Sequence, residues 1–240
     1  KATEKIDALY KKYAPGRKPK LIVEEFMEGP VHSVDAFVGA EGNPNLLEQI
    51  VDYETGYDIG YDDNFHYSRN IPSKLSSADQ HKLRQCAEMG VKALSMKSSP
   101  AHIEIIMTSQ GPRIVEIGAR NGGYRARMHG LANGIDVIGN TLLLALGKKP
   151  NITASQNDPC AVLELFPKKH GIFDRLTHEK ELRELPSVVS VALKAKPGQL
   201  VGKSSDGYKM TAIIVLHNTS QDQLDKDLVY IRDNVSVVTT

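Results

Sequence analysis

The sequence predicts an α+β fold, in which an antiparallel sheet with helices is followed by a smaller α+β unit. Short apolar segments at 21–27, 31–38 and 46–51 are separated by Gly-Pro and Gly-Asn-Pro turns, a pattern typical of an antiparallel meander. Two more strands, at 101–107 and 112–117, flank a Gln-Gly-Pro turn and are expected to form a hairpin. Other segments, which lie before, between and after these strands, have apolar residues at helical spacing.

The predicted helices have apolar residues three and four positions apart. Residues 5–14 follow this spacing until Pro15-Gly16 ends it, and a second helix begins at Ser77. The pattern returns over 124–147. The segment Gly-Lys-Lys-Pro-Asn then marks a boundary between a domain at 1–149 and a second domain at 150–240.

The second predicted domain is small and of the α+β class. Its strands are expected at 160–166, 187–194 and 211–217, and its helix at 221–232. A capping box at Ser220-x-x-Gln would begin that helix.

Composition excludes several classes of function. The 240 residues are 40% hydrophobic, and 30 basic against 29 acidic residues leave a net charge of +1, so no overall field favours nucleic acid or anionic lipid. The most apolar run, around 142–146, is too short to span a membrane. Cys86 and Cys160 lie far apart, which fits free thiols in a reducing compartment. We therefore expect a cytoplasmic protein.

Residues 52–64 are rich in Gly, Asp and Tyr and lack a sustained apolar period. This composition predicts a mobile loop over a site, with an idle surface loop as the alternative.

The hairpin carries the main functional prediction. If Glu104 pairs with Glu116, these two side chains share one face with His102, Gly118 and Arg120, because strand side chains alternate. The other face then receives Ile103, Ile105, Val115 and Ile117 as core residues. Two facing carboxylates repel unless a cation lies between them, and oxygen ligands suit Mg²⁺. The alternative is a solvated face on which Arg120 offsets the two glutamates, and a bulge would separate them.

The stretch PAHIEIIMTSQGPRIVEIGARNGGYR resembles the C-terminal signature of the ATP-grasp superfamily. The resemblance implies that Glu104 and Glu116 are Mg²⁺ ligands, with Mn²⁺ as an alternative ion, and that Arg120 stabilises a phosphate or acyl-phosphate. Gly118 departs from the pattern, because many members carry a metal-binding asparagine there.

A second stretch, LIVEEFMEGPVHSVDAFV, resembles the hinge strand of the same superfamily, which binds the adenine of ATP. By this resemblance Glu24 and Glu25 face the adenine amino group, and Met27 supplies a backbone N–H and packing. Taken alone, the segment also reads as an ordinary sheet edge.

The stretch FHYSRNIPSKL resembles a strand that faces the acyl acceptor in carboxylate–amine ligases. The resemblance implies that His66 acts on the acyl-phosphate carbonyl or the amine, and that Arg69 holds a substrate carboxylate. Asn121, Gly122 and Gly123 would bring backbone N–H groups close to an anionic substrate. Exposed strand residues and ordinary turn residues are the alternatives.

Together these resemblances imply an ATP-dependent carboxylate–amine ligase of the L-amino-acid-ligase type, which acts on a small-molecule carboxylate and an amine. A purine-biosynthetic or biotin-carboxylase-like enzyme is one alternative, and a non-catalytic nucleotide- or metal-binding module is another. The superfamily's glycine-rich phosphate loop precedes the hinge strand, and the chain opens at Lys1. We therefore expect a fragment that needs the N-terminal remainder of its parent chain and binds ATP weakly by itself. The sequence does not determine its oligomeric state.

Overall fold

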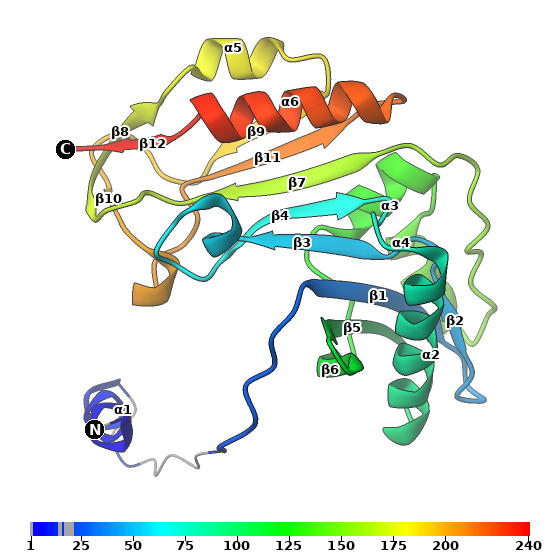
Figure 1. The fold of residues 1–240 in the computed structure, drawn as a ribbon. Helices are drawn as coiled ribbons and strands as arrows, with labels where there is room; N and C mark the ends of the chain where they lie inside the picture. The colour runs from blue at the N-terminus through cyan, green and yellow to red at the C-terminus, as the bar shows by residue number, and fades with distance from the viewer. Residues whose placement is uncertain (1, 14–15, 17–21) are drawn as a thin grey trace.

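The computed structural model describes residues 2–13, 16 and 22–240. Its largest element is a nine-stranded sheet with the order β6-β5-β1-β3-β4-β7-β11-β9, in which β2 also pairs with β1 (Figure 1). All of its strand pairs are antiparallel, as predicted. The strands are β1 (Val31–Val38), β2 (Pro44–Leu46), β3 (Val51–Thr55), β4 (His66–Ile71), β5 (Ser99–Thr108), β6 (Gly111–Gly118), β7 (Cys160–Leu165), β9 (Val188–Leu193) and β11 (Ala212–His217).

A small sheet and six helices complete the described part of the chain. The small sheet has the order β10-β8-β12. Its strands are β8 (Gly171–Leu176), β10 (Leu200–Val201) and β12 (Val237–Thr239). The helices are α1 (Ala2–Tyr13), α2 (Ser77–Ala93), α3 (Arg125–Asn133), α4 (Val137–Ala145), α5 (Glu179–Glu184) and α6 (Gln221–Asn234), with 3₁₀ turns at Tyr57–Ile59 and Ser204–Asp206. None of these helices is long and apolar enough to cross a bilayer.

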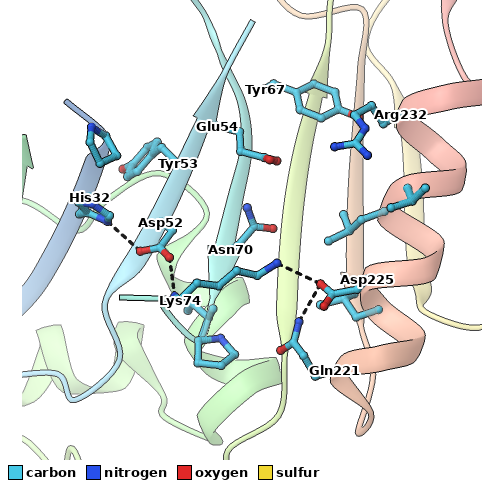
Figure 2. Close-up of a pocket in the computed structure, with 16 residues that line it drawn as sticks. His32, Asp52, Tyr53, Glu54, Tyr67, Asn70, Lys74, Gln221, Asp225 and Arg232 are labelled. Carbon is cyan, nitrogen blue, oxygen red and sulfur yellow. Dashed lines mark hydrogen bonds and ion pairs between the residues drawn. The ribbon is translucent and has the colours of Figure 1, made fainter. Parts of the chain in front are cut away.

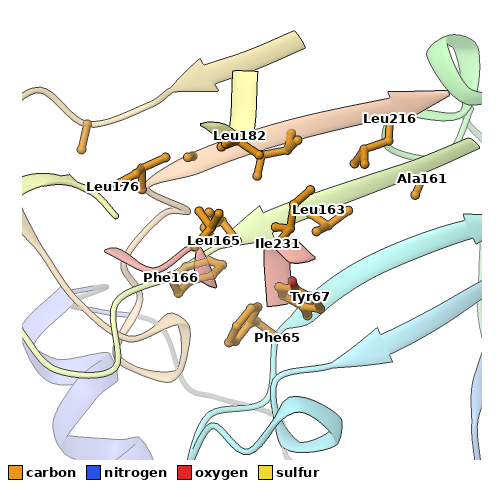
Figure 3. Close-up of a cluster of buried hydrophobic side chains, with 14 of the residues drawn as sticks. Phe65, Tyr67, Ala161, Leu163, Leu165, Phe166, Leu176, Leu182, Leu216 and Ile231 are labelled. Carbon is orange, nitrogen blue, oxygen red and sulfur yellow. The ribbon is translucent and has the colours of Figure 1, made fainter. Parts of the chain in front are cut away.

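Two helices cover one face of the large sheet. Helix α2 buries Leu83, Ala87 and Val91 against the apolar side chains of β1 and β5. Helix α6 buries Leu224 and Ile231 over β7 and β11, in a cluster shown in Figure 3. Between these two cores the same face is polar, since the register places Asp52 opposite Asn70.

Helices α3 and α4 cover part of the opposite face. Met128 and Ala132 of α3 pack on β3, β4 and β7, and Val137 and Leu144 of α4 join a smaller cluster. The remainder of this face, over β5 and β6, carries the polar side chains predicted for the site.

The large sheet continues across the predicted boundary at 149/150. Strand β7 pairs with β4, with Ser68 opposite Leu163 and Ile71 opposite Cys160 (Figure 1). Strands from both predicted domains thus share one hydrogen-bonded ladder, and the division into two domains stays a prediction.

Three predicted elements differ from the structure. Residues 22–27 of the predicted strand 21–27 form no strand, because none of the described strands pairs with their backbone, and Val23 is 96% exposed; Leu21 lies outside the described residues. Residues 47–50 of the predicted strand 46–51 connect β2 to β3, and β3 extends into the predicted loop as far as Thr55. The helix expected over 124–147 is divided at Gly134, whose φ of 71° ends α3, after which Asp136 caps α4.

Candidate active site

The register of the β5–β6 hairpin places the two predicted metal ligands opposite each other. Glu104 pairs with Glu116, and His102 pairs with Gly118, which is the register on which the predicted site depends. An irregularity follows Glu104, so that Ile105 pairs with Ile114 rather than with Val115. Val115 is therefore 48% exposed, and its predicted place in the core was wrong. The bulge lies beyond the two glutamates and does not separate them.

Glu104 is partly buried, and its carboxylate contacts a histidine. Its Oε1 lies 3.2 Å from Nε2 of His102, and Nδ1 of His102 lies 2.8 Å from Oδ1 of Asp35. The hydrogen bond from His102 lowers the pKa of Glu104, against the opposing effect of burial. Burial by itself would lower the pKa of His102, but the hydrogen bonds to Asp35 and Glu104 raise it above its ordinary value.

Arg125 closes this network from helix α3. It is 1% exposed, and its Nε donates to Oδ2 of Asp35 at 3.0 Å. Its Nη2 donates to Ser33 Oγ at 2.8 Å and to the hydroxyl of Tyr53. Burial alone would raise the pKa of Asp35, but the Arg125 charge and the His102 hydrogen bond hold it well below its usual range.

Sequence reasoning missed Asp35 and Arg125 and gave His102 no role beyond its place on the polar face. One signal was available in the strand VHSVDAFV, where Ser33 and Asp35 are polar at alternate positions. That alternation marks a polar face on β1, although it does not name the partners.

Glu116 lies in a different environment. Its side chain is 53% exposed and forms an ion pair with Arg120, whose Nη2 lies 3.3 Å from Glu116 Oε1. Arg120 also donates to the carbonyl of Asn121 at 3.1 Å. Both side chains are open to solvent, so this pair leaves Glu116 able to turn toward another cation.

The donor set fits Mg²⁺ bound together with phosphates. Two facing carboxylates supply hard oxygen ligands, and Mg²⁺ takes its other ligands from waters and substrate phosphates. Within the described residues, no group of three or more His, Cys, Asp or Glu side chains would hold a metal ion by itself.

His66 and Arg69 belong to a second polar cluster on the same face. Arg69 Nη2 lies 3.4 Å from Glu164 Oε2, and the hydroxyl of Tyr124 donates to Glu164 Oε1 at 2.7 Å. The Arg69 guanidinium lies 5.2 Å from the ring centre of Tyr124, and the His66 ring lies 4.5 Å from that of Tyr53. Burial and the Arg69 charge lower the pKa of His66, which keeps its ring neutral at pH 7.

His66, Arg69 and Glu164 of this cluster line a pocket of about 380 Å³, together with residues 204 and 208–210. Lys209 and Tyr208 form part of its wall, while Arg69 and Glu164 are largely buried. A pocket with a cation and a carboxylate in contact suits a zwitterionic or carboxylate-bearing small molecule.

The predicted substrate loop is tied to the buried network. A Cβ on Gly122 would lie 2.5 Å from His102 Nδ1 and 2.7 Å from Arg125 Cγ, so only glycine fits there. Gly123 has open space around its Cα, and its carbonyl accepts a hydrogen bond from Arg125 at 3.2 Å. The Asn121 side chain donates to Thr141 of α4 at 2.9 Å.

The predicted adenine-binding residues lie at the other end of the hairpin. Glu24, Glu25 and Met27 line a pocket of about 510 Å³ with residues 108–110 and 113–115. Gly29 comes so close to β5 that an added Cβ would lie 2.2 Å from the Met107 carbonyl oxygen. The structure thus brings this segment beside the hairpin turn, but neither Glu104 nor Glu116 lines the same pocket.

A further pocket lies on the opposite face of the sheet, between β3, β4 and α6 (Figure 2). It has a volume of about 470 Å³ and contains none of the predicted site residues. His32 contacts Asp52 at 2.8 Å, and Asp52 accepts the backbone N–H of Lys74 at 2.7 Å. The first bond joins β1 to β3, and the second joins β3 to the segment between β4 and α2.

Comparison with known proteins identifies the family. Residues 1–127, more than half of the chain, match the family model described as the ATP-grasp domain. The chain therefore belongs to the ATP-grasp family. A curated relative, the uncharacterized protein y4rH of Sinorhizobium fredii (strain NBRC 101917 / NGR234), is 23% identical over 209 residues, which cover 86% of this chain and 42% of that protein.

Solved structures share the fold at low identity. The L-amino acid ligase from Bacillus licheniformis superposes with a TM-score of 0.76 at 17% identity, over 90% of this chain and 53% of that one. The phosphoribosylglycinamide synthetase from Anaerococcus prevotii gives 0.70 at 17% identity, over 100% and 61%. The biotin carboxylase domain of the Hydrogenobacter thermophilus 2-oxoglutarate carboxylase, solved as a dimer with MgADP, ADP and bicarbonate, gives 0.58 at 14% identity, over 90% and 48%. The chain spans about half the length of these relatives.

Proposed function

We propose that the chain forms part of an ATP-dependent ligase that activates a carboxylate as an acyl-phosphate for attack by an amine. The observation that carries this proposal is the pairing of Glu104 with Glu116 on the β5–β6 hairpin of an ATP-grasp fold. In this proposal residues 1–149 carry the nucleotide site, and residues 150–240 form a lobe that completes the substrate pocket.

The two glutamates and Arg120 would serve the phosphoryl transfer. Mg²⁺, when bound with ATP, neutralises charge on the phosphates that are transferred and released. Glu104 and Glu116 would hold that ion, and the exposed Arg120 would exchange its contact with Glu116 for a phosphoryl oxygen. Glu24, Glu25 and Met27 would bind the adenine at the far end of the hairpin.

The second polar cluster would bind the substrates. Arg69 would hold a carboxylate, and the backbone at Asn121, Gly122 and Gly123 would contact an anionic group. His66 would accept a proton from the attacking amine, because its lowered pKa leaves the ring neutral at pH 7. The likeness to the L-amino acid ligase supports an amino acid as one substrate.

A purine-biosynthetic ligase is the second candidate. The phosphoribosylglycinamide synthetase covers the whole of this chain at a TM-score of 0.70, which favours it over a biotin-carboxylase-like enzyme, whose domain gives 0.58. ADP release, measured with amino acids and with phosphoribosylamine-type acceptors in turn, separates the amino-acid ligase from the purine-biosynthetic ligase.

The metal assignment is tested by Glu116→Gln in the full-length parent protein. The change removes one carboxylate while keeping the shape of the side chain, so Mg²⁺-dependent ADP formation should be lost and the unfolding temperature preserved. Glu88→Gln, on the exposed surface of α2, is the matched control. Unchanged ADP formation in the Glu116 variant would remove Glu116 from the metal site.

We also expect the 240-residue chain, which spans about half of its relatives, to bind Mg·ATP weakly by itself. Titration calorimetry measures this directly. Micromolar affinity with turnover would show that these residues alone make a complete enzyme.

A further inference from the structure

We propose that His102 is a positioning residue, which holds the Glu104 carboxylate in one orientation and connects it to the loop at 121–125. This inference rests on the proposed metal site, because it concerns how one of the two ligands is held. It assigns a role to Asp35, His102 and Arg125, which lie beneath the site and contact neither phosphate nor substrate in the proposal.

His102 contacts the proposed metal ligand Glu104 directly. The His102 ring is only 2% exposed, and each of its nitrogens lies within 3.2 Å of a carboxylate oxygen, Asp35 on one side and Glu104 on the other. A buried ring with both nitrogens engaged cannot rotate without losing two hydrogen bonds. Its orientation therefore sets the position of Glu104 Oε1.

Asp35 and Arg125 hold the other nitrogen of the His102 ring in place. Asp35 Oδ1 contacts His102, while Oδ2 accepts from Arg125 Nε at 3.0 Å. Arg125 is held in turn by Ser33 and Tyr53. Three elements, β1, β5 and α3, thus determine where the imidazole lies.

The proposed substrate loop packs on the same network. Gly122 packs so closely on His102 and Arg125 that a methyl group would overlap both. Arg125 also donates to the carbonyl of Gly123 at 3.2 Å. A displaced imidazole would therefore move the loop and the carboxylate together.

The loss of metal affinity expected on removing His102 can be gauged from metal sites in other proteins. Removing a partner that orients a ligand typically weakens metal affinity about 10- to 100-fold. The two proposed ligands differ in how they are held: Glu104 contacts a buried histidine, whereas Glu116 pairs with the exposed Arg120.

The substitutions His102→Gln and His102→Asn separate a positioning role of His102 from a simple packing role. The amide nitrogen of glutamine can take the place of Nε2 and donate to Glu104, whereas that of asparagine takes the place of Nδ1 and reaches only toward Asp35. We would measure Mn²⁺ affinity by electron paramagnetic resonance in the full-length protein with a non-hydrolysable ATP analogue, together with the unfolding temperature. His81→Ala, on the exposed surface of α2, is the control.

We expect His102→Asn and His102→Ala to weaken Mn²⁺ affinity about 10- to 100-fold, and His102→Gln to retain most of it. Equal affinities in the Asn and Gln variants, whether both normal or both weak, would overturn the inference. Glu104→Gln and Glu116→Gln test the underlying site in the same assay. If neither weakens Mn²⁺ binding, the proposed metal site itself is wrong; if both do while His102→Asn and His102→Ala bind normally, only the positioning role fails.

Discussion

Glu104 and Glu116 face each other across one hairpin, yet they lie in contrasting environments. Glu104 is backed by a buried chain of hydrogen bonds through His102 and Asp35 to Arg125. Glu116 is half exposed and pairs with a surface arginine. The difference shows that strand register decides which side chains meet, while packing from other elements decides how firmly each is held.

The contrast also separates stability from ligand binding. Breaking a buried ion pair leaves an uncompensated charge, which is costly, whereas an exposed pair contributes about 0–1 kcal/mol. Substitutions on the Glu104 side should therefore affect folding as well as binding, and those on the Glu116 side should affect binding alone.

The largest expected effect is that of Asp35→Asn. This change removes the negative charge opposite the buried Arg125, so the free energy of unfolding should fall by about 3–5 kcal/mol. Urea denaturation followed by circular dichroism measures the loss. Glu88→Gln, which breaks an exposed pair with Lys92, is the control and should cost less than about 1 kcal/mol. If Asp35→Asn costs no more than Glu88→Gln, the buried network adds no stability.

The next effect compares two adjacent glycines. Gly122→Ala places a methyl group against His102 and Arg125 and should cost about 1–3 kcal/mol through overpacking. Gly123→Ala meets open space and should change stability by less than about 0.5 kcal/mol. The midpoints of urea unfolding give both values. If Gly123→Ala proves the more damaging, the loop does not pack on the network as described.

A smaller effect depends on pH. The pKa of Glu104 is lowered in the folded state, so the charged carboxylate stabilises the fold above its unfolded pKa of about 4.3 and loses this contribution as pH falls through the folded pKa. Glu104→Gln should thus cost about 1 kcal/mol near pH 7, and the difference from the wild type should shrink as the pH falls below the unfolded pKa of about 4.3 and through the lower pKa of the folded carboxyl. Unfolding curves at several pH values test this. A difference that grows in acid would contradict it.

The smallest effect is that of Arg120→Gln. Arg120 and Glu116 are both more than half exposed, so the loss of their pair should change the free energy of unfolding by less than about 1 kcal/mol. If Arg120 contacts a phosphoryl group, the same variant should reduce ADP formation in the full-length protein. A marked loss of stability would show that the exposed pair supports the hairpin more than its solvation suggests.

Much of the fold followed from local patterns. The alternation of His102 and Glu104 with Ile103 and Ile105 predicted the polar face of the hairpin, whereas the pairing of Glu104 with Glu116 was a condition that only the structure decided. Turn residues predicted most of the strand ends. The bulge at Val115 was beyond such patterns, since a single extra residue leaves no clear mark in the sequence.

The sequence by itself determined the polar face of the hairpin and the resemblance from which the family was inferred, because both depend on residues close together in the chain. Tertiary structure decided the rest of the site. Asp35 meets His102 across 67 positions and Arg125 across 90, and such contacts exist only once β1, β5 and α3 have packed. Likewise, residues 22–27 have strand-like composition but form no strand, since a strand depends on a neighbour for its hydrogen bonds and none of the described strands pairs with them.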